Sequence, residues 1–385
     1  MDAVAHGGHC VGRADGQVVF VRHALPGERV EVEVTDVASK GRFLRADVVA
    51  VLEPSPFRVE PPCSYAGPGR CGGCDWQHVS VDHQRTLKAE VVAEQLHRLG
   101  GVDRDVVVEP VPGDSDGLRW RTKVRFAVDG AGRAGLRPHR THDVLTIDDC
   151  LIAHPMIDCR SVTQTLWEGA EWVEVASSAT TGEREVRVYP GPMAAALHHE
   201  AAGRSWQVSG GGFWQVHPGA ADVLSSCVVE MLRPAAGEHL LDLYSGAGLF
   251  AGVVAPLLGP GGRVDAVEGG RAPAEDARLN LADLDIVEVH ECSVAQFLAR
   301  GRLRGCDLVV LDPPRTGAGA DIVEEVVALR PRALAYVACD PAALARDVRT
   351  FASLGYDLAT LRGFDLFPMT QHVECVALLE TSPSS

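Results

Sequence analysis

The chain has 385 residues, of which 46% are hydrophobic, and a formal net charge of −16 at pH 7. A chain of this length buries a large core and is expected to divide into two or three domains, because single cores stop growing near ~250 residues. The acidic balance argues against a general nucleic-acid coat, but it leaves room for a local basic face, since partner choice depends on where the charges lie.

The sequence shows no sign of export or membrane insertion. No apolar run approaches the roughly 18 residues of a membrane span, and the first residues, MDAVAHGGHC, have neither a basic start nor an apolar signal segment. The eleven cysteines are scattered along the chain, which indicates free thiols, metal ligands or catalysis rather than a disulfide framework. We therefore expect a cytoplasmic protein without a membrane partner.

Residues 1–56 have the pattern of short strands. The stretch GQVVFVRHALPGERVEVEV alternates β-branched and polar residues at period two, and Pro26-Gly27 supplies a turn signal. This pattern predicts a small OB-like β-barrel, and such barrels often bind nucleic acid. An inert structural module is the alternative interpretation.

A proline-punctuated linker leads to the cysteine-rich stretch CSYAGPGRCGGCDWQH. Seven residues separate Cys63 from Cys71, and two separate Cys71 from Cys74. Glycine-rich backbone lets thiolates this close point at one centre, which suits soft metals. We expect Cys150, which closes a short apolar run, as the fourth ligand, with Cys159 as the alternative. Zinc and an iron–sulfur cluster both fit four thiolates, and three ordinary buried thiols are the plainer interpretation.

Two segments between these cysteines carry further information. Residues 82–100 predict an amphipathic helix with an aspartate cap and a terminal glycine. In LRWRTKVRFAV (118–128), alternate residues of a strand would share a face. That face would carry what we call the cationic row: Arg119, Arg121, Lys123 and Arg125. With so little acid nearby in the sequence, the cationic row predicts a track for RNA phosphates rather than a solvated sheet face.

From residue 206 onward the chain alternates strands and helices in the doubly wound manner. Apolar strands are expected in EHLLDL, GRVDAVE, IVEVHE, CDLVVL and ALAYVA. Ligands of such sheets lie beyond the carboxyl ends of the strands. The turn DLYSGAG includes Gly246, and Glu268 ends the second strand, where an acid suits a ribose diol. Without a phosphate-binding lysine motif, this pattern favours S-adenosylmethionine over NAD or ATP.

Cys339 closes the fifth predicted strand, at the same sheet edge as Asp312. Asp340-Pro341 follows at once and starts a helix, whose N-terminus is expected to lower the pKa of the thiol and produce a nucleophile. Thiolate addition at C6 of uracil would make C5 reactive towards a methyl sulfonium. Glu374, inside the apolar stretch VECVALL, would be costly to bury without a partner or a task.

These motifs resemble the RNA 5-methyluridine methyltransferases, in the branch that combines an N-terminal TRAM barrel, a four-cysteine [4Fe–4S] site and a C-terminal methyltransferase domain. The resemblance runs nearly end to end and is carried by GGFWQVHPGAADVL, DLYSGAG, LDPPRTG, YVACDPAALARD and HVECVALLE. It implies an RNA-binding TRAM domain at 1–56, an α+β central domain at 57–205 and an α/β Rossmann-like catalytic domain at 206–385.

The resemblance also implies roles for individual residues. Cys339 would be the nucleophile, and Glu374 the base that removes the C5 proton, with Asp312 beside them. S-adenosylmethionine would contact Gln215, Tyr244, Gly246, Glu268 and Asp312. The cluster would be held by Cys63, Cys71, Cys74 and Cys150.

The sequence departs from the family pattern at three positions. Asp340 and His217 stand where Asn is usual, and Ser293 stands where an acid after the third strand is common. The last departure leaves the adenine contact open.

We therefore expect a monomeric enzyme that methylates C5 of a specific uridine in structured RNA, with ribosomal RNA favoured over transfer RNA by analogy. An RNA cytosine-5 methyltransferase is one alternative, separated by assay of uridine against cytidine transcripts. A non-catalytic, cluster-containing RNA-binding protein is the other, and S-adenosylmethionine binding without methyl transfer would favour it.

Overall fold

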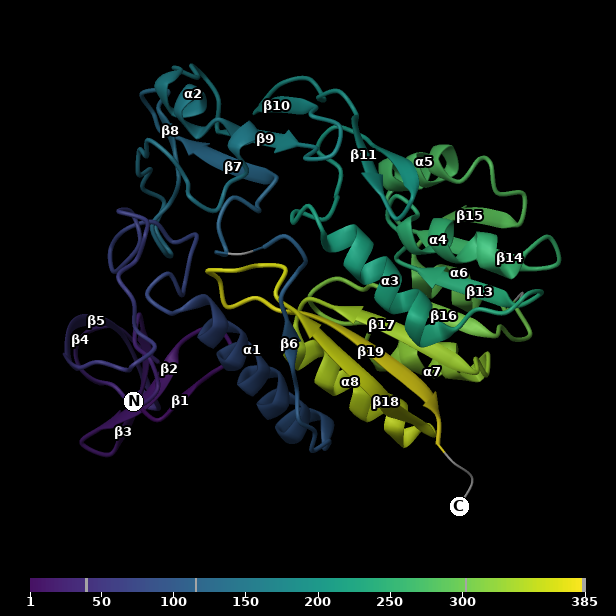
Figure 1. The fold of residues 1–385 in the computed structure, drawn as a ribbon, viewed down its shortest axis with the longest axis horizontal. Helices are drawn as coiled ribbons and strands as arrows, with labels where there is room; N and C mark the ends of the chain where they lie inside the picture. Colours follow the sequence, from purple (N-terminus) through teal and green to yellow (C-terminus); the bar gives the residue numbers. More distant parts are fainter. Residues whose placement is uncertain (39–40, 115, 302, 383–385) are drawn as a thin grey trace.

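The structure is a computed structural model that describes residues 1–38, 41–114, 116–301 and 303–382. Its strands form an N-terminal sheet, a central sheet, a two-stranded hairpin and a large C-terminal sheet. Figure 1 shows the N-terminal and central sheets on one side of the molecule and the large sheet on the other, with helix α1 (Val81–Gln95) between the N-terminal and large sheets. Within the described ranges, no helix is both long and apolar enough to cross a bilayer.

The N-terminal sheet has five strands in the order β1-β2-β3-β5-β4, all paired antiparallel except β3 with β5. Val19 and Val21 are buried in its small core, so the alternate residues Phe20 and Arg22 face outward. The strand pattern is confirmed, and closure into a barrel stays a prediction. The strands are β1 (Ala3–Val4), β2 (Cys10–Ala14), β3 (Gln17–Arg22), β4 (Arg29–Val37) and β5 (Leu44–Glu53).

The central sheet has the order β10-β9-β7-β8, with a short helix, α2 (Cys159–Gln164), beside it. Val124, Phe126 and Val173 are buried in its core. A separate hairpin, β11 with β12, leads towards the C-terminal sheet. The strands are β7 (Lys123–Val128), β8 (Ala134–Gly135), β9 (Trp172–Ser177), β10 (Arg184–Tyr189), β11 (Leu197–Ala201) and β12 (Arg204–Val208).

The C-terminal sheet has eight strands in the order β15-β14-β13-β16-β17-β19-β18-β6. The five strands predicted from sequence are its parallel part, from β15 to β17. β19 then pairs antiparallel with both β17 and β18, and β6 adds a short parallel edge. The strands are β6 (Val108–Glu109), β13 (His239–Leu243), β14 (Arg263–Glu268), β15 (Val287–Glu291), β16 (Leu308–Leu311), β17 (Ala333–Ala338), β18 (Tyr356–Phe364) and β19 (Glu374–Thr381).

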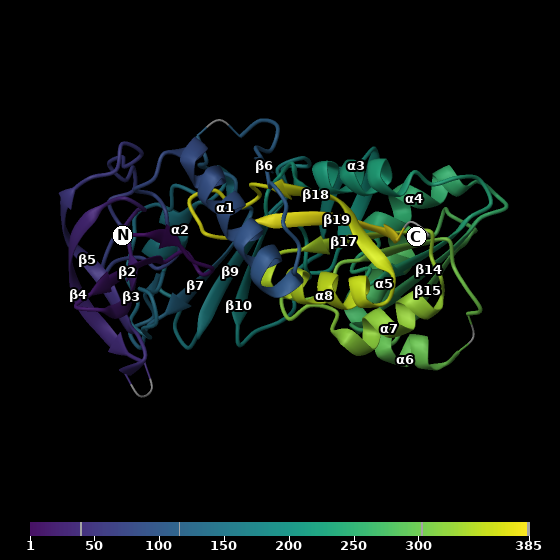
Figure 2. The ribbon, with the colours of Figure 1, turned by 90° about the horizontal axis from the view of Figure 1, so that it is seen from below.

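Helices cover both faces of this sheet, which explains why its central strands are almost continuously apolar. One core includes residues of α3, α4 and α5, and the other includes residues of α1, α6, α7 and α8. Figure 2 shows α3 and α4 on one side of the strands and α6, α7 and α8 on the other. The helices are α3 (Ala220–Leu232), α4 (Leu249–Leu258), α5 (Arg271–Asn280), α6 (Val294–Ala299), α7 (Ala320–Ala328) and α8 (Pro341–Ser353).

The N-cap of helix α1 lies two residues earlier than the sequence suggests. Ser80 occupies the N-cap position and Asp82 lies in the first turn, so the predicted aspartate cap is wrong. The helix ends near the predicted glycine, through a wider helical turn at Leu96–Gly100.

A buried cation on α1 connects it to the C-terminal sheet. Lys88 is fully buried, pairs with the Asp365 carboxylate and donates a hydrogen bond to the carbonyl of Phe367 at 3.0 Å. Buried charges are tolerated in proteins when they are paired in this way. Helix α1 falls within the predicted 57–205 region, yet it packs on the large sheet and holds the loop that precedes β19.

Candidate active site

Two predicted catalytic side chains meet at the carboxyl edge of the large sheet. Cys339 lies just beyond the end of β17, and Glu374 is the first residue of the neighbouring strand β19. Because β19 runs antiparallel and Ala338 pairs with Cys375, Cys339 and Glu374 are the next opposed residues in this register. Asp312 follows β16, the strand on the other side of β17.

Carboxyl groups dominate the electrostatics of this crevice. Burial, with smaller contributions from Glu374 and Asp312, raises the pKa of the Cys339 thiol to about 11, and Arg315 opposes this shift. Burial and the neighbouring Asp312 hold the pKa of Glu374 well above its usual range. Burial raises the pKa of Asp312 to about 7. The Cys339 thiol therefore holds its proton at neutral pH.

The sequence analysis predicted a thiolate at the start of α8, and the raised pKa of Cys339 shows that this prediction is wrong. Asp340 is the N-cap of α8, and its carboxylate accepts the backbone N–H of Ala343 at 2.8 Å. This carboxylate uses a donor of the helix N-terminus and places a negative charge there, so less of the helix dipole is left to stabilise a thiolate at Cys339.

The turn after β13 has the backbone that the glycine motif predicts. Tyr244 and Gly246 have φ of 65° and 55°, and Gly248 has φ of 92°. Glu268, at the end of β14, accepts the backbone N–H of Gly246 at 3.0 Å and that of Gly270 at 2.6 Å. The acid therefore lies directly at the glycine turn, where the ribose of a bound nucleoside is expected in such sheets.

Asp242, in β13, was missed by the sequence analysis. It is fully buried, and one carboxylate oxygen accepts the N–H of Ala251 at 2.9 Å, while the other has no hydrogen-bond partner among the described residues. Burial raises the pKa of Asp242 to about 7, and the charges of Asp312 and Glu268 add to this shift. The sequence did contain a signal for Asp242, because an acidic residue inside the apolar run HLLDL is costly to bury without a task.

The structure also places one further predicted cofactor residue, Gln215, and two of the departures from the family pattern, His217 and Ser293. Gln215 lies in the loop between β12 and α3 and lines a small cleft with Thr122 and His199. His217 is buried against Trp120, with ring centroids 6.2 Å apart, and burial lowers its pKa to about 4. Ser293 caps α6 through a reciprocal pair of hydrogen bonds with Gln296, so it has a structural task there.

The four predicted metal ligands line one cavity. Cys63, Cys71, Cys74 and Cys150 surround a volume of about 240 Å³, and Cys159 is not among the lining residues. Among the described residues, no three cysteine sulfurs lie within 4.8 Å of one another. Four thiols around one cavity are a donor set that suits a soft metal or an iron–sulfur cluster.

The structure overturns the premise of the cationic row. Only Lys123 and Arg125 belong to β7, and both pair with the buried Glu174, at 3.3 and 2.8 Å. Arg119 has φ of 59°, which is not strand geometry, and pairs with Asp149 at 2.5 Å. Two carboxylates from distant parts of the sequence, Asp149 and Glu174, thus pair with three of its four cations. Two of its members line the cysteine cavity: Arg121 and Arg125.

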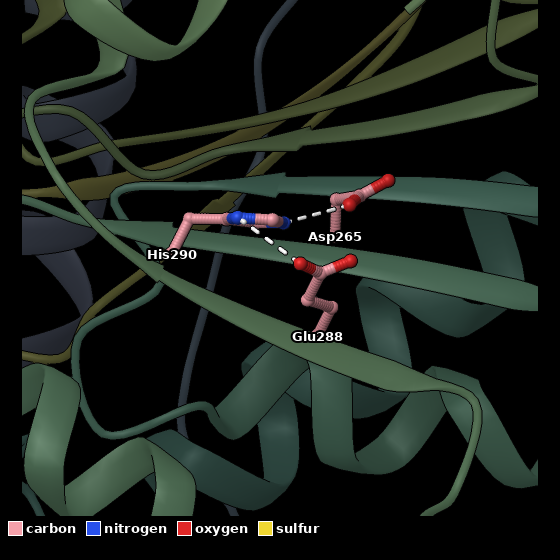
Figure 3. A group of neighbouring side chains, drawn as sticks. All are labelled: Asp265, Glu288 and His290. Atoms are coloured by element: carbon pink, nitrogen blue, oxygen red, sulfur yellow. Dashed lines mark hydrogen bonds and ion pairs between the residues drawn. The ribbon is translucent and has the colours of Figure 1, made fainter. Parts of the chain in front are cut away.

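A second cluster of ionisable groups lies on β14 and β15. Figure 3 shows His290 between Asp265 and Glu288, and the His290 Nε2 atom lies 2.7 Å from the Asp265 carboxylate. His239 and Arg263 also contact Asp265, at 2.6 and 2.9 Å. The carboxylate is therefore already surrounded by donors, and the guanidinium would repel a metal cation. This cluster is best described as an ion-pair network.

Arg315, which opposes the raised pKa values of Cys339 and Glu374, also escaped the sequence analysis. Its loop is held by Asp347 of α8, which accepts the N–H of Ala318 at 2.8 Å and the hydroxyl of Tyr336 at 2.6 Å. The motif LDPPRTG contained a signal for Arg315, since this arginine follows two prolines at the end of a predicted strand. The structure shows that it is exposed at the sheet edge.

The doubly wound sheet, the glycine turn after β13 and the acid that ends β14 together define an S-adenosylmethionine-dependent methyltransferase domain. Residues 206–382 match the family model of tRNA (uracil-5-)methyltransferases, and residues 2–49 match the TRAM domain.

Comparisons over the whole chain agree. An uncharacterized RNA methyltransferase of Streptomyces avermitilis is 48% identical, over 98% of this chain and 96% of its own length. A 23S rRNA (uracil(1939)-C(5))-methyltransferase of Pseudomonas putida is 32% identical, over 99% of this chain and 92% of its own. The structure of a Pyrococcus abyssi tRNA (uracil-54, C5)-methyltransferase with S-adenosyl-L-homocysteine has the same fold, with a TM-score of 0.70, 22% identity and 94% of both chains covered. The chain belongs to the RNA (uracil-5-)methyltransferase family.

Proposed function

We propose that the protein methylates C5 of one uridine in ribosomal RNA through a covalent bond between Cys339 and C6 of the uracil. The observation that carries this proposal is the register of β17 and β19, which opposes a thiol and a carboxyl group at the ligand edge of the sheet. The thiol that adds to the uracil ring and the carboxylate that later removes a proton from it must both reach the same nucleobase.

The chemistry divides between these residues. The Cys339 thiol loses its proton to solvent, the thiolate adds to C6, and the electron pair of the C5–C6 double bond moves into an enolate that ends on O4. S-adenosylmethionine would supply the methyl group that C5 takes up, and S-adenosylhomocysteine would be the leaving group. Glu374 then removes the C5 proton, the double bond re-forms and the thiolate leaves. Arg315, which favours the charged forms of both Cys339 and Glu374, is suited to assist both proton losses.

Cofactor binding is proposed for Gln215, Tyr244, Gly246, Glu268 and Asp312. Support comes from the turn geometry and from the hydrogen bond between Glu268 and Gly246. The buried, unpartnered oxygen of Asp242 offers a further acceptor for a ligand with donor groups.

We propose a [4Fe–4S] cluster at the four-cysteine cavity. The four thiols that line one cavity support it, and the lining arginines suit the negative charge of a cluster bound by four thiolates. None of the proposed catalytic residues lines this cavity, and we propose a structural role for the cluster.

For the RNA, the outer face of the N-terminal sheet replaces the cationic row as the proposed contact. Phe20 and Phe43 pack edge to face at 5.2 Å, and the Arg45 guanidinium lies over Phe43 at 5.7 Å. Aromatic and cationic side chains together suit stacked bases and phosphates. Ribosomal RNA is favoured by the activity of the Pseudomonas putida relative, a 23S rRNA methyltransferase.

The experiment is methylation of unmodified 23S rRNA and tRNA transcripts with labelled S-adenosylmethionine, followed by nucleoside analysis. Labelled 5-methyluridine from rRNA alone is the expected result. Labelled 5-methylcytidine would replace the proposal with the cytosine-5 alternative, and label in tRNA alone would overturn the choice of RNA.

A further inference from the structure

The N-terminal domain reaches the catalytic crevice through one turn. In the hairpin between β1 and β2, the Ala5 carbonyl accepts the N–H of Gly8 at 3.1 Å, and the Ala5 N–H donates to His9 at 2.8 Å. Gly7 has φ of 96°, which fits the third position of a tight turn. His6 is therefore presented at the tip of this turn.

The turn is fixed against the segments that carry the catalytic groups. The Gly8 carbonyl accepts the indole N–H of the buried Trp76 at 3.1 Å. A side chain at Gly8 would come within 2.7 Å of Gln371, three residues before Glu374. Asp75 in turn accepts the backbone N–H of Gln371 at 3.2 Å. The tip has little freedom to move away from the crevice.

His6 pairs with the residue that follows the proposed nucleophile. Its Nε2 atom lies 3.3 Å from the second carboxylate oxygen of Asp340, and both side chains are partly exposed, at 37% and 25%. The first oxygen of Asp340 caps α8, so the two oxygens have separate partners. Without His6, the Asp340 carboxylate would lose the ion-pair partner it has among the described residues and would keep only the longer-range influence of Arg346.

We propose that His6 is a positioning residue of the catalytic crevice, supplied by the N-terminal domain, which neutralises the Asp340 carboxylate beside Cys339. Negative charge near the thiol opposes its ionisation and repels the RNA backbone. The pair thus favours formation of the covalent bond between Cys339 and uracil, and the inference rests on that proposed chemistry.

The charged groups around the pair set its pH dependence. The hydrogen bond to Asp340 raises the pKa of His6; burial and Arg346 of α8 oppose this, and Glu94 of α1 adds to it. His372 faces Asp340 but is neutral near pH 7, because burial lowers its pKa to about 4. A raised pKa means that the charge pair is present at low pH and is lost as the pH rises through the pKa of His6.

The test is the rate of adduct formation between the full-length protein and a 23S rRNA transcript containing 5-fluorouridine, with S-adenosylmethionine, read on denaturing gels. His6→Gln should slow the reaction roughly fivefold at pH 6.5, the order expected for a half-exposed charge pair. This ratio to wild type should shrink towards one as the pH rises. His198→Gln, which removes another pair of an exposed histidine with a carboxylate, His198 with Glu183, should change nothing.

Asp340→Asn supplies the decisive background, because Asn caps a helix as well as Asp does. In that background His6→Gln should have no further effect on the rate. An equal slowing in both backgrounds would show a merely structural role and overturn the inference, as would a His6→Gln rate equal to wild type at pH 6.5. If the wild-type protein forms no adduct, the nucleophile assignment fails first and the inference falls with it.

Discussion

The protonation of Cys339 is the feature in which the structure departs most from the sequence-based expectation. A thiol with a pKa of about 11 has a thiolate fraction of roughly one in ten thousand at pH 7 and one in a hundred at pH 9. Only the thiolate reacts with alkylating reagents. The alkylation rate of Cys339 in the ligand-free protein should therefore keep rising about tenfold per pH unit up to pH 10.

The assay is pulsed iodoacetamide labelling across this pH range, with peptide mass spectrometry to separate Cys339 from the other cysteines. Two variants should move the titration in opposite directions. Glu374→Gln removes a charge that raises the pKa of the thiol, so its curve should shift to lower pH. Arg315→Gln removes a charge that lowers this pKa, so its curve should shift to higher pH. A wild-type rate that levels off below pH 8 would refute this account of the crevice and restore the predicted thiolate.

Three further predictions concern the supports of the site. Lys88→Met should lower the free energy of unfolding in urea by about 3–5 kcal/mol, because it strands the buried Asp365 carboxylate, and Lys88→Met with Asp365→Leu should recover most of the loss; a fully stable single variant would contradict the burial argument. Protein purified without oxygen should be brown and contain about equal iron and sulfide, and Cys150→Ser should lose both whereas Cys159→Ser keeps them; stoichiometric zinc without sulfide would rule the cluster out. Arg45→Gln should reduce the slope of log affinity for RNA against log salt by roughly 0.7 to 0.9; an unchanged slope would return the RNA path to the cationic row.

The parallel part of the large sheet could be predicted from sequence because it is buried on both faces. Its strands are apolar along their whole length, and glycines or acids mark their carboxyl ends. The same logic placed Cys339, Asp312 and Glu268 at one edge. Edge strand β6 escaped prediction because two residues carry no periodic signal.

The sequence missed the acidic partners of the cationic row because they come from distant parts of the chain, and RNA binding by the row stays a prediction. Glu174 lies on β9 and Asp149 in a loop, and neither pairing with the row is visible until the sheet is formed. The prediction of a lowered pKa for the Cys339 thiol was wrong for a related reason. A helix N-terminus is readable from Asp340-Pro341, whereas the burial and the carboxyl groups around Cys339 depend on how strands β16, β17 and β19 come together.

The central claim is that Cys339 and Glu374 act in sequence on one uracil, and intact-mass analysis of trapped complexes tests it most directly. Glu374→Gln keeps the shape of the side chain and loses the base, so with 23S rRNA and labelled S-adenosylmethionine it should accumulate a covalent protein–RNA complex that carries one methyl group. Cys339→Ala should form no complex and transfer no methyl group. Wild-type turnover by Glu374→Gln, or a covalent complex with Cys339→Ala, would contradict the account.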